Sequence, residues 1–435
     1  MVAANTMSLE LFKIESMMGA YIGLMWFYPH PSTSTLLEAV QHVQAGADKV
    51  VAASPVLGGI LRASTPVRIE YDEAKSKVTV ESVEVPYTFA EIEQSGFDQN
   101  KYPLLFGAIP NLTPDLEGLP VLRVWVFGLC CGGLVVAVAS HHVLVDGVAA
   151  VDVAMSIGRA CSDPESTPEA MWSSRDKIRE VLTASLKGDE VVDDSYYRHL
   201  RQLTPTISSG DGGLKTSGKV RWNQFSLKAE SLRRLKELAS QSVNENGDAC
   251  STNDMVAALF WRAHARALTI HGSTSEYTYT GGPKDLRGIL GVTNCLGNII
   301  VLCPAYATKD VVLADQGLVP VARIVRRFTQ NGCAVGLLKF MDAMENGTPN
   351  ILATLGATDS PSTAFSNLAR MPVRQVDFGL GRLGSAQMRA FSRPFTVHTI
   401  DDGAGGFLAN LYLPASMLTS YLCDAEFMSY ADQVY

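Results

Sequence analysis

Apolar residues recur along the first half of the chain with the two periods that distinguish strands from helices. Continuous apolar runs over 22–28, 121–127 and 133–139 predict buried strands. A short glycine-containing segment joins the last two runs, which predicts a hairpin. Apolar residues at helical spacing then predict a helix from about Gly147 to Cys161. The N-terminal half is therefore expected to mix strands with helices.

A polar stretch rich in glycine, serine and threonine interrupts this pattern and predicts a linker over 204–218. The pattern restarts after it, with a strand predicted over 220–226 and an amphipathic helix over 228–242. The Ser-x-x-Asp sequence at 251–254 is typical of a helix start, and the apolar residues after it predict a helix that ends near Leu268.

The predicted linker divides the 435 residues into halves of similar size, as expected for two domains. We place an N-terminal domain at 1–203, the linker at 204–218 and a C-terminal domain at 219–435. Hydrophobic residues make up 47% and charged residues 18% of the sequence, which is enough apolar material for two large cores.

Charge and cysteine usage exclude several classes of partner. The net charge is −8 and no basic run is present, which argues against binding of nucleic acid. The start of the chain lacks the basic region and cleavage site of a secretory signal, and its apolar stretch at 20–28 is shorter than the about 20 residues that span a bilayer. None of the eight cysteines forms a Cys-x-x-Cys pair, so we expect reduced thiols without a metal site. A cytoplasmic protein without a membrane partner is therefore expected.

Two adjacent histidines at the end of a predicted strand are the strongest candidates for chemistry. Histidine titrates near neutrality, so it suits proton transfer at physiological pH. His141 and His142 follow the apolar run at 133–139, and Asp146 and Gly147 come four and five residues after His142. A rigid strand would hold one of these rings at a cleft. A phosphate-binding loop, a zinc-binding His-Glu-x-x-His helix and a Gly-x-Ser-x-Gly elbow are all missing from the sequence.

The segment from His142 to Gly147 resembles the HxxxDG signature of the BAHD acyltransferases, which belong to the wider chloramphenicol-acetyltransferase-like superfamily. Five further segments are similar to family motifs and occur in the family's order. They are SPVLGGILR (54–62), STNDMVAALFWRAHARA (251–267), DLRGILGVTNCLGNII (285–300), VDFGLGR (376–382) and GAGGFLANLYLPASML (403–418). The resemblance covers nearly the whole chain, and the segment at 251–267 is closest to the fungal branch that acylates secondary metabolites.

The resemblance implies an α/β fold of two chloramphenicol-acetyltransferase-like domains, each with a mixed sheet flanked by helices, and an active-site channel between them. It also implies an acyl-CoA-dependent O- or N-acyltransferase. Such an enzyme transfers a short acyl group, for example acetyl, from CoA to a hydroxyl or amine of a small secondary metabolite. Acyl-CoA would be a co-substrate, no cofactor or metal would be bound, and the protein would act as a monomer.

The same resemblance implies a role for each candidate site residue. His142 would be the general base. Residues with a structural role at the site would be Asp146, Gly147, Arg287, Asp377 and Gly379. Contacts to the oxyanion or the substrate are expected from Asn298 and Ser366, and contacts on the CoA side from Leu380 and Arg382. We further expect Arg287 and Asp377 to form a buried ion pair.

The sequence departs from the family pattern at two positions. Leu380 stands where the family usually has tryptophan, and Leu383 stands where proline is common. These departures bear on the use of CoA. Two alternatives therefore remain open: a CoA-independent condensation or ring-forming enzyme on the same fold, and a non-catalytic protein that binds small molecules.

Overall fold

The structure of the protein is a computed structural model that describes residues 6–16, 18–110, 112–185, 220–241, 249–331, 336–338, 341, 362–389 and 395–434. The chain divides into two compact units. The first unit contains Met1–Ala184, Arg287–Ile299 and Met371–Phe391, and the second contains Ser185–Leu286, Ile300–Arg370 and Ser392–Tyr435. Two segments of the C-terminal half thus belong to the first unit, which differs from the contiguous halves expected from the sequence. The linker expected over 204–218 lies outside the described residues.

The first unit is built on a five-stranded sheet with the order β12-β2-β7-β6-β5. Neighbouring strands are antiparallel except β5 and β6, which are parallel. The strands are β2 (Tyr21–Tyr28), β5 (Val80–Val85), β6 (Leu122–Leu129), β7 (Leu134–His141) and β12 (Ser385–Arg389). A separate three-stranded sheet has the order β1-β4-β3, with β1 at Thr6–Glu10, β4 at Arg68–Asp72 and β3 at Ile60–Arg62.

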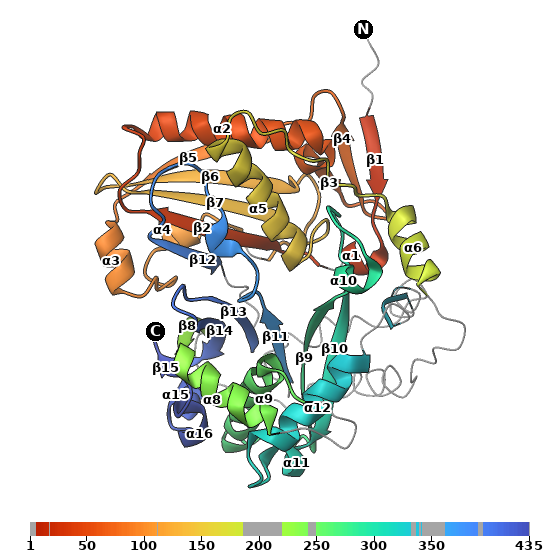
Figure 1. Ribbon diagram of the computed structural model, residues 1–435, viewed down its shortest axis with the longest axis vertical. Coiled ribbons are helices and arrows are strands. Elements are labelled where there is room, and N and C mark those ends of the chain that lie inside the picture. The colour runs from red at the N-terminus through yellow and green to blue at the C-terminus, as the bar shows by residue number, and fades with distance from the viewer. Residues whose placement is uncertain are drawn as a thin grey trace. The chain divides into compact units, whose positions relative to one another are not determined.

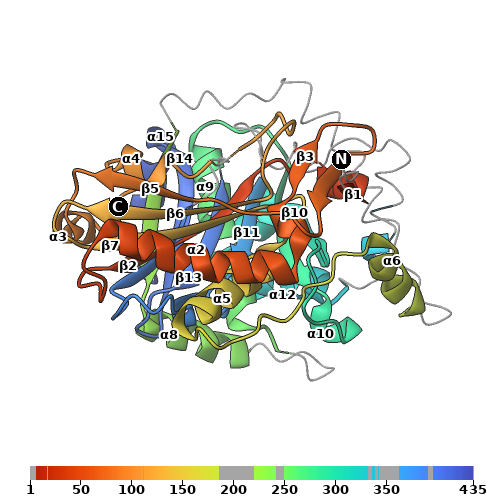
Figure 2. The ribbon, with the colours of Figure 1, turned by 90° about the horizontal axis from the view of Figure 1, so that it is seen from above.

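Helices cover both faces of the five-stranded sheet, which explains why β2 and β7 consist entirely of buried residues. Helices α2 (Leu36–Ala53) and α5 (Gly147–Ser162) lie together on one face (Figures 1 and 2). They approach closely at Gly46, where an added Cβ would collide with the Cys161 sulfur. The other face packs against α3 (Phe89–Gln94) and α4 (Pro103–Phe106) through a single apolar cluster.

Short elements connect these layers to the remaining segments of the first unit. They are α1 (Lys13–Ser16), α6 (Arg175–Ala184), α10 (Arg287–Leu290) and the 3-10 turns Pro55–Gly58 and Val373–Gln375. The segment Met371–Phe391 is tied to the sheet by β12, which pairs with β2, and by the Trp26 indole, whose N–H donates to the Val373 carbonyl at 2.7 Å.

The second unit is built on a seven-stranded mixed sheet with the order β10-β9-β11-β13-β14-β8-β15. The strands are β8 (Val220–Leu227), β9 (Tyr277–Asp285), β10 (Ile300–Thr308), β11 (Ser362–Asn367), β13 (Thr396–Asp401), β14 (Phe407–Pro414) and β15 (Asp432–Gln433). The described helices are α8 (Ala229–Ser240), α9 (Thr252–Ile270), α11 (Lys309–Leu313), α12 (Leu318–Asn331), α15 (Ala415–Leu422) and α16 (Ala425–Met428).

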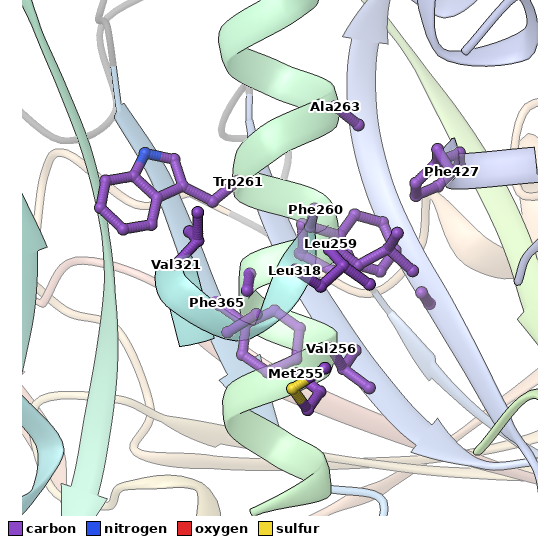
Figure 3. Close-up of a cluster of buried hydrophobic side chains, with 14 of the residues drawn as sticks. Met255, Val256, Leu259, Phe260, Trp261, Ala263, Leu318, Val321, Phe365 and Phe427 are labelled. Atoms are coloured by element: carbon purple, nitrogen blue, oxygen red, sulfur yellow. The ribbon is translucent and has the colours of Figure 1, made fainter. Parts of the chain in front are cut away.

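Helix α9 is the centre of the second core. It begins with the predicted capping box: the Ser251 hydroxyl accepts the Asp254 N–H, and the Asp254 carboxylate accepts the Ser251 N–H. Figure 3 shows its apolar side chains packed with residues of α12, β11 and α16, among them Phe365 and Phe427. Fourteen of the nineteen residues of α9 are buried, as expected for a helix enclosed on several sides. Among the helices that the structure describes, none is long and apolar enough to cross a bilayer.

Replacement of Phe260 by alanine is expected to destabilise the protein by about 3–5 kcal/mol, the usual effect of removing an aromatic ring from a core. The ring is 1% exposed and contacts the rings of Phe365 and Phe427. The matched control is Ile270→Ala at the end of the same helix, where the side chain is 69% exposed and the effect should stay within about 0.5 kcal/mol. Urea unfolding measures both; equal losses would contradict this account of the core.

Candidate active site

The end of β7 places two neighbouring histidines in different environments. His141 is the last residue of β7 and is fully buried; its Nε2 lies 3.0 Å from the Thr113 hydroxyl, and its ring meets the edge of Tyr21. Burial lowers the pKa of His141 to about 3, so this ring is neutral near pH 7. His142 follows the strand, is only half-buried, and its backbone N–H donates to the Ala20 carbonyl at 2.8 Å. Of the two rings, His142 is the one available for proton transfer.

Asp146 is a structural residue that caps helix α5. One carboxylate oxygen accepts the Ala149 N–H at 3.0 Å, and Gly147 is the first helical residue. The other oxygen accepts the Arg287 guanidinium at 2.8 Å and the Ile299 N–H at 3.0 Å. Asp146 is completely buried, so its side chain is turned away from solvent. Its contacts connect the start of α5 to Arg287 and Ile299.

Arg287 pairs with Asp146, so the predicted ion pair between Arg287 and Asp377 is wrong. The side chain of Asp377 is exposed, and its Oδ1 accepts the Gly379 N–H at 2.8 Å within its own turn. A buried carboxylate needs a cation far more than an exposed one does, which explains the choice of partner. The Arg287 guanidinium also donates to the Gly297 carbonyl at 2.9 Å, so the pair fastens the segment 295–299 to the start of α5.

Asn298, within this segment, makes two contacts with His142, one to the ring and one to the backbone. Its Oδ1 lies 3.1 Å from the His142 Nδ1, and its Nδ2 donates to the His142 backbone carbonyl at 2.9 Å. The residue is 8% exposed. The amide group of Asn298 thus binds the histidine itself, and its expected contact to the oxyanion or the substrate stays a prediction.

A second buried ion pair supports the same segment and was not expected from the sequence. Glu15 of α1 is 1% exposed and accepts two hydrogen bonds from Arg175, at 2.9 and 2.8 Å. Arg175 also donates to the Leu296 carbonyl at 2.8 Å, and the Asn298 N–H points to Glu15 at 3.4 Å. The partners are 160 residues apart, and neither lies in a family motif, so no spacing signal could have revealed the pair.

The loop at 377–382 packs inside the first unit. The His42 ring donates to the Phe378 carbonyl at 2.8 Å, and the Ser32 N–H donates to the Leu380 carbonyl at 2.9 Å. Gly379 has a φ of +69°, and a Cβ at this position would lie only 3.2 Å from His42 Nε2, so glycine is required. Leu380 is fully buried, which corrects the expectation that its side chain offers a surface to CoA. Arg382 is exposed and stays a prediction on the CoA side.

Ser366 lies in β11 of the second unit, where it is half-buried opposite His398 of β13. Its predicted contact to the oxyanion or the substrate stays a prediction. Within the described parts of the chain, no cluster of three or more histidine, cysteine or acidic side chains could hold a metal ion.

The second unit contains a basic pocket of about 420 Å³ beside the N-terminus of α9. Its polar lining residues are Arg233, Lys236, Thr252, Asn253, Asn367 and Arg370. Arg233 is neutralised by Glu230 and Glu237. Lys236 and Arg370 are exposed and form no ion pair with any residue of the described ranges. Two unpaired cations and the positive end of a long helix make this pocket suitable for an anion.

The sequence of this chain is similar to those of known transferases. A family model described as "Transferase family" matches residues 85–421. The O-acetyltransferase dmxR13 of Cryptosporiopsis sp. (strain 8999) is 25% identical over 283 residues, 62% of this chain and 58% of that protein. Trichothecene 3-O-acetyltransferase TRI101 of Fusarium sporotrichioides is 21% identical over 253 residues, 58% of this chain and 54% of that protein. The matches thus span little more than half the length of these relatives.

Solved structures with the same fold cover the whole chain. F. graminearum TRI101 complexed with coenzyme A and T-2 mycotoxin has a TM-score of 0.75 at 18% identity, covering 99% of this chain and 100% of that one. Vinorine synthase has a TM-score of 0.69 at 16% identity, covering 99% of this chain and 95% of that one. The α/β fold with mixed sheets flanked by helices is therefore confirmed.

Replacement of Asp146 by alanine is expected to lower the free energy of unfolding by about 3–5 kcal/mol, because it leaves the buried Arg287 guanidinium without its partner. Asp377→Ala is the matched control and should cost less than about 1 kcal/mol, since that carboxylate is exposed. Chemical denaturation compares the two. A larger loss for Asp377→Ala would restore the ion pair predicted from the sequence.

Proposed function

Since this chain belongs to the Transferase family of BAHD-type acyltransferases, we propose that it transfers a short acyl group, such as acetyl, from CoA to a hydroxyl or amine of a small secondary metabolite. His142 acts as the general base. The fungal relatives named above are O-acetyltransferases, which favours a hydroxyl acceptor and an acetyl donor. The proposal includes the cytoplasmic location and the monomeric state expected from the sequence.

The position of His142 carries this proposal. Its ring is partly exposed at the end of a buried strand, its backbone is fixed by Ala20, and its Nδ1 is engaged by Asn298. The other ring nitrogen, Nε2, is then the one that meets an acceptor. Asp146 is fully committed to α5 and Arg287, so it does not compete as a base.

The reaction follows from this placement. His142 Nε2 takes the proton of the acceptor hydroxyl or amine while the acceptor atom attacks the thioester carbonyl carbon. The carbonyl becomes a tetrahedral oxyanion, which a hydrogen-bond donor must stabilise. Asn298 and Ser366 stay the candidates for this donor. The oxyanion collapses, the carbon–sulfur bond breaks, and the imidazolium returns its proton to the CoA sulfur.

The basic pocket of the second unit supports a donor that carries phosphate groups. CoA has such groups far from its reacting carbon, and two cations that line one pocket can bind them. Lys236 and Arg370 supply the charge, and Thr252 and Asn253 lie in the first turn of α9, where backbone N–H groups point outward. This pocket favours a CoA-dependent enzyme over the two alternatives.

His142→Ala is expected to lower kcat by about 100- to 10,000-fold, the usual contribution of a positioned acid–base group. The assay follows the release of free CoA thiol with acetyl-CoA and a panel of hydroxylated and amino acceptors. His141→Ala is the control: it should reduce stability through loss of ring packing and have a smaller effect on kcat per folded molecule. A folded His142→Ala protein with near-normal kcat would exclude the general-base role.

The double variant Lys236→Ala/Arg370→Ala is expected to raise KM for acetyl-CoA about 10-fold or more with little change in kcat, because anchoring contacts far from the reacting carbon act on binding. Arg234→Ala, on the same helix but outside the pocket, is the matched control. Acetyl-pantetheine, which lacks the nucleotide phosphates, should not distinguish the double variant from the wild type. An unchanged KM would remove the pocket from the donor site.

A further inference from the structure

We propose that Asn298 and the buried ion pair of Glu15 and Arg175 are positioning residues that keep the proton of the neutral His142 ring on Nδ1, so that Nε2 is the basic nitrogen. This inference rests on the proposed role of His142 as the general base. It gives Glu15 of α1 and Arg175 of α6, both of them buried, a role in positioning His142.

The hydrogen-bond pattern determines the tautomer without reference to hydrogen positions. A backbone carbonyl can only accept, so the Asn298 atom that lies 2.9 Å from the His142 carbonyl must be the amide nitrogen. The amide oxygen therefore faces Nδ1 at 3.1 Å. An amide oxygen also can only accept, so Nδ1 must be the nitrogen that carries the proton. Rotation of the amide by 180° would oppose two acceptors at the carbonyl and is excluded.

The ion pair in turn fixes Asn298. Glu15 accepts two hydrogen bonds from Arg175, one from the Phe12 N–H at 3.1 Å and a longer one from the Asn298 N–H at 3.4 Å. Arg175 holds the Leu296 carbonyl two residues before Asn298. A buried charged pair with its hydrogen bonds satisfied tolerates little displacement, so the backbone on which the Asn298 amide stands is held in place.

The charged groups around this network occur in neutralised pairs. Glu15 faces Arg175, Asp146 faces Arg287, and the neighbouring His141 is uncharged near pH 7. The group opposite Nδ1 is a neutral amide. The network thus sets the orientation and the tautomer of the ring through a neutral amide, with both described carboxylates, Glu15 and Asp146, paired to arginines.

Nitrogen NMR of protein labelled in the histidine rings tests the tautomer directly and needs no substrate. His142→Gln identifies the signals of His142 among the eight histidines. The wild type is expected to show a protonated Nδ1 and an unprotonated Nε2 at pH above the ring's titration, and Asn298→Ala should show a mixture of both tautomers. Asn223→Ala removes another buried asparagine, in β8 of the second unit, and should leave the signals unchanged. A wild-type proton on Nε2 overturns the proposal.

Steady-state kinetics of Asn298 variants distinguish a role in positioning His142 from a role in stability alone. Asn298→Ala is expected to lower kcat about 10- to 100-fold with a smaller change in KM, as for other groups that orient a histidine. Asn298→Asp keeps an oxygen opposite Nδ1 but adds a negative charge, which favours the imidazolium; the acid limb of kcat/KM should move to higher pH. Unchanged kcat and pH profiles in both variants would leave Asn298 a purely structural residue. Loss of general-base activity in His142→Ala is independent of these outcomes.

The double variant Glu15→Gln/Arg175→Gln removes both charges of the ion pair and tests the outer part of the network. We expect mixed His142 tautomer signals and a kcat lowered about 10-fold. Arg262→Gln/Glu426→Gln removes another ion pair, in the second unit, and controls for loss of stability alone. Glu15→Asp, which keeps the charge on a shorter side chain, gives the same readout in a milder form if the double variant does not fold. Wild-type signals in the folded variants would remove the ion pair from the positioning network.

Discussion

The buried ion pair of Asp146 and Arg287 is the interaction on which the site depends. Asp146 belongs to the turn after β7, and Arg287 begins a segment more than 100 residues later in the chain. A carboxylate at the N-terminus of α5 is favoured by the helix dipole, but complete burial requires a cation as well. Arg287 supplies that cation and carries the segment 295–299 with it. For this reason a piece of the C-terminal half folds into the first unit and reaches His142.

Each of the two buried ion pairs near His142 forms hydrogen bonds with backbone groups of the segment 295–299. Asp146 accepts the Ile299 N–H and Glu15 the Asn298 N–H, while the two arginines bind the carbonyls of Gly297 and Leu296. Every charge is therefore used to satisfy backbone groups that would be costly to bury alone. The ring of His142, beside this segment, is half-buried. Two carboxylates and two arginines thus hold the segment that binds the half-buried His142.

The regular parts of both units could be predicted because they depend on local patterns. The apolar runs became β2, β6 and β7, and the Ser-x-x-Asp sequence at 251–254 became the capping box of α9. The partner of Arg287 could not be predicted, because two carboxylates lie in family motifs and only the folded chain shows that Asp146 is the buried one. Glu15 and Arg175 gave no local signal at all. The inward packing of Leu380 follows from turns at Gly379 and Gly381, both at positive φ, whose effect on direction is invisible in the sequence.

The arrangement around His142 also bears on how one family can acylate very different acceptors. The relatives of this chain include a trichothecene 3-O-acetyltransferase and an anthranilate N-benzoyltransferase, whose names give different acceptors and different acylated atoms. In this chain, the polar groups of Asp146, Arg287 and Asn298 described above bind one another, the histidine, or backbone groups of α5 and the segment 295–299. They hold His142 and the segment 295–299 in place. Under the proposed function, the choice of acceptor would then fall to side chains outside this network, which can change without disturbing the fold or the position of His142.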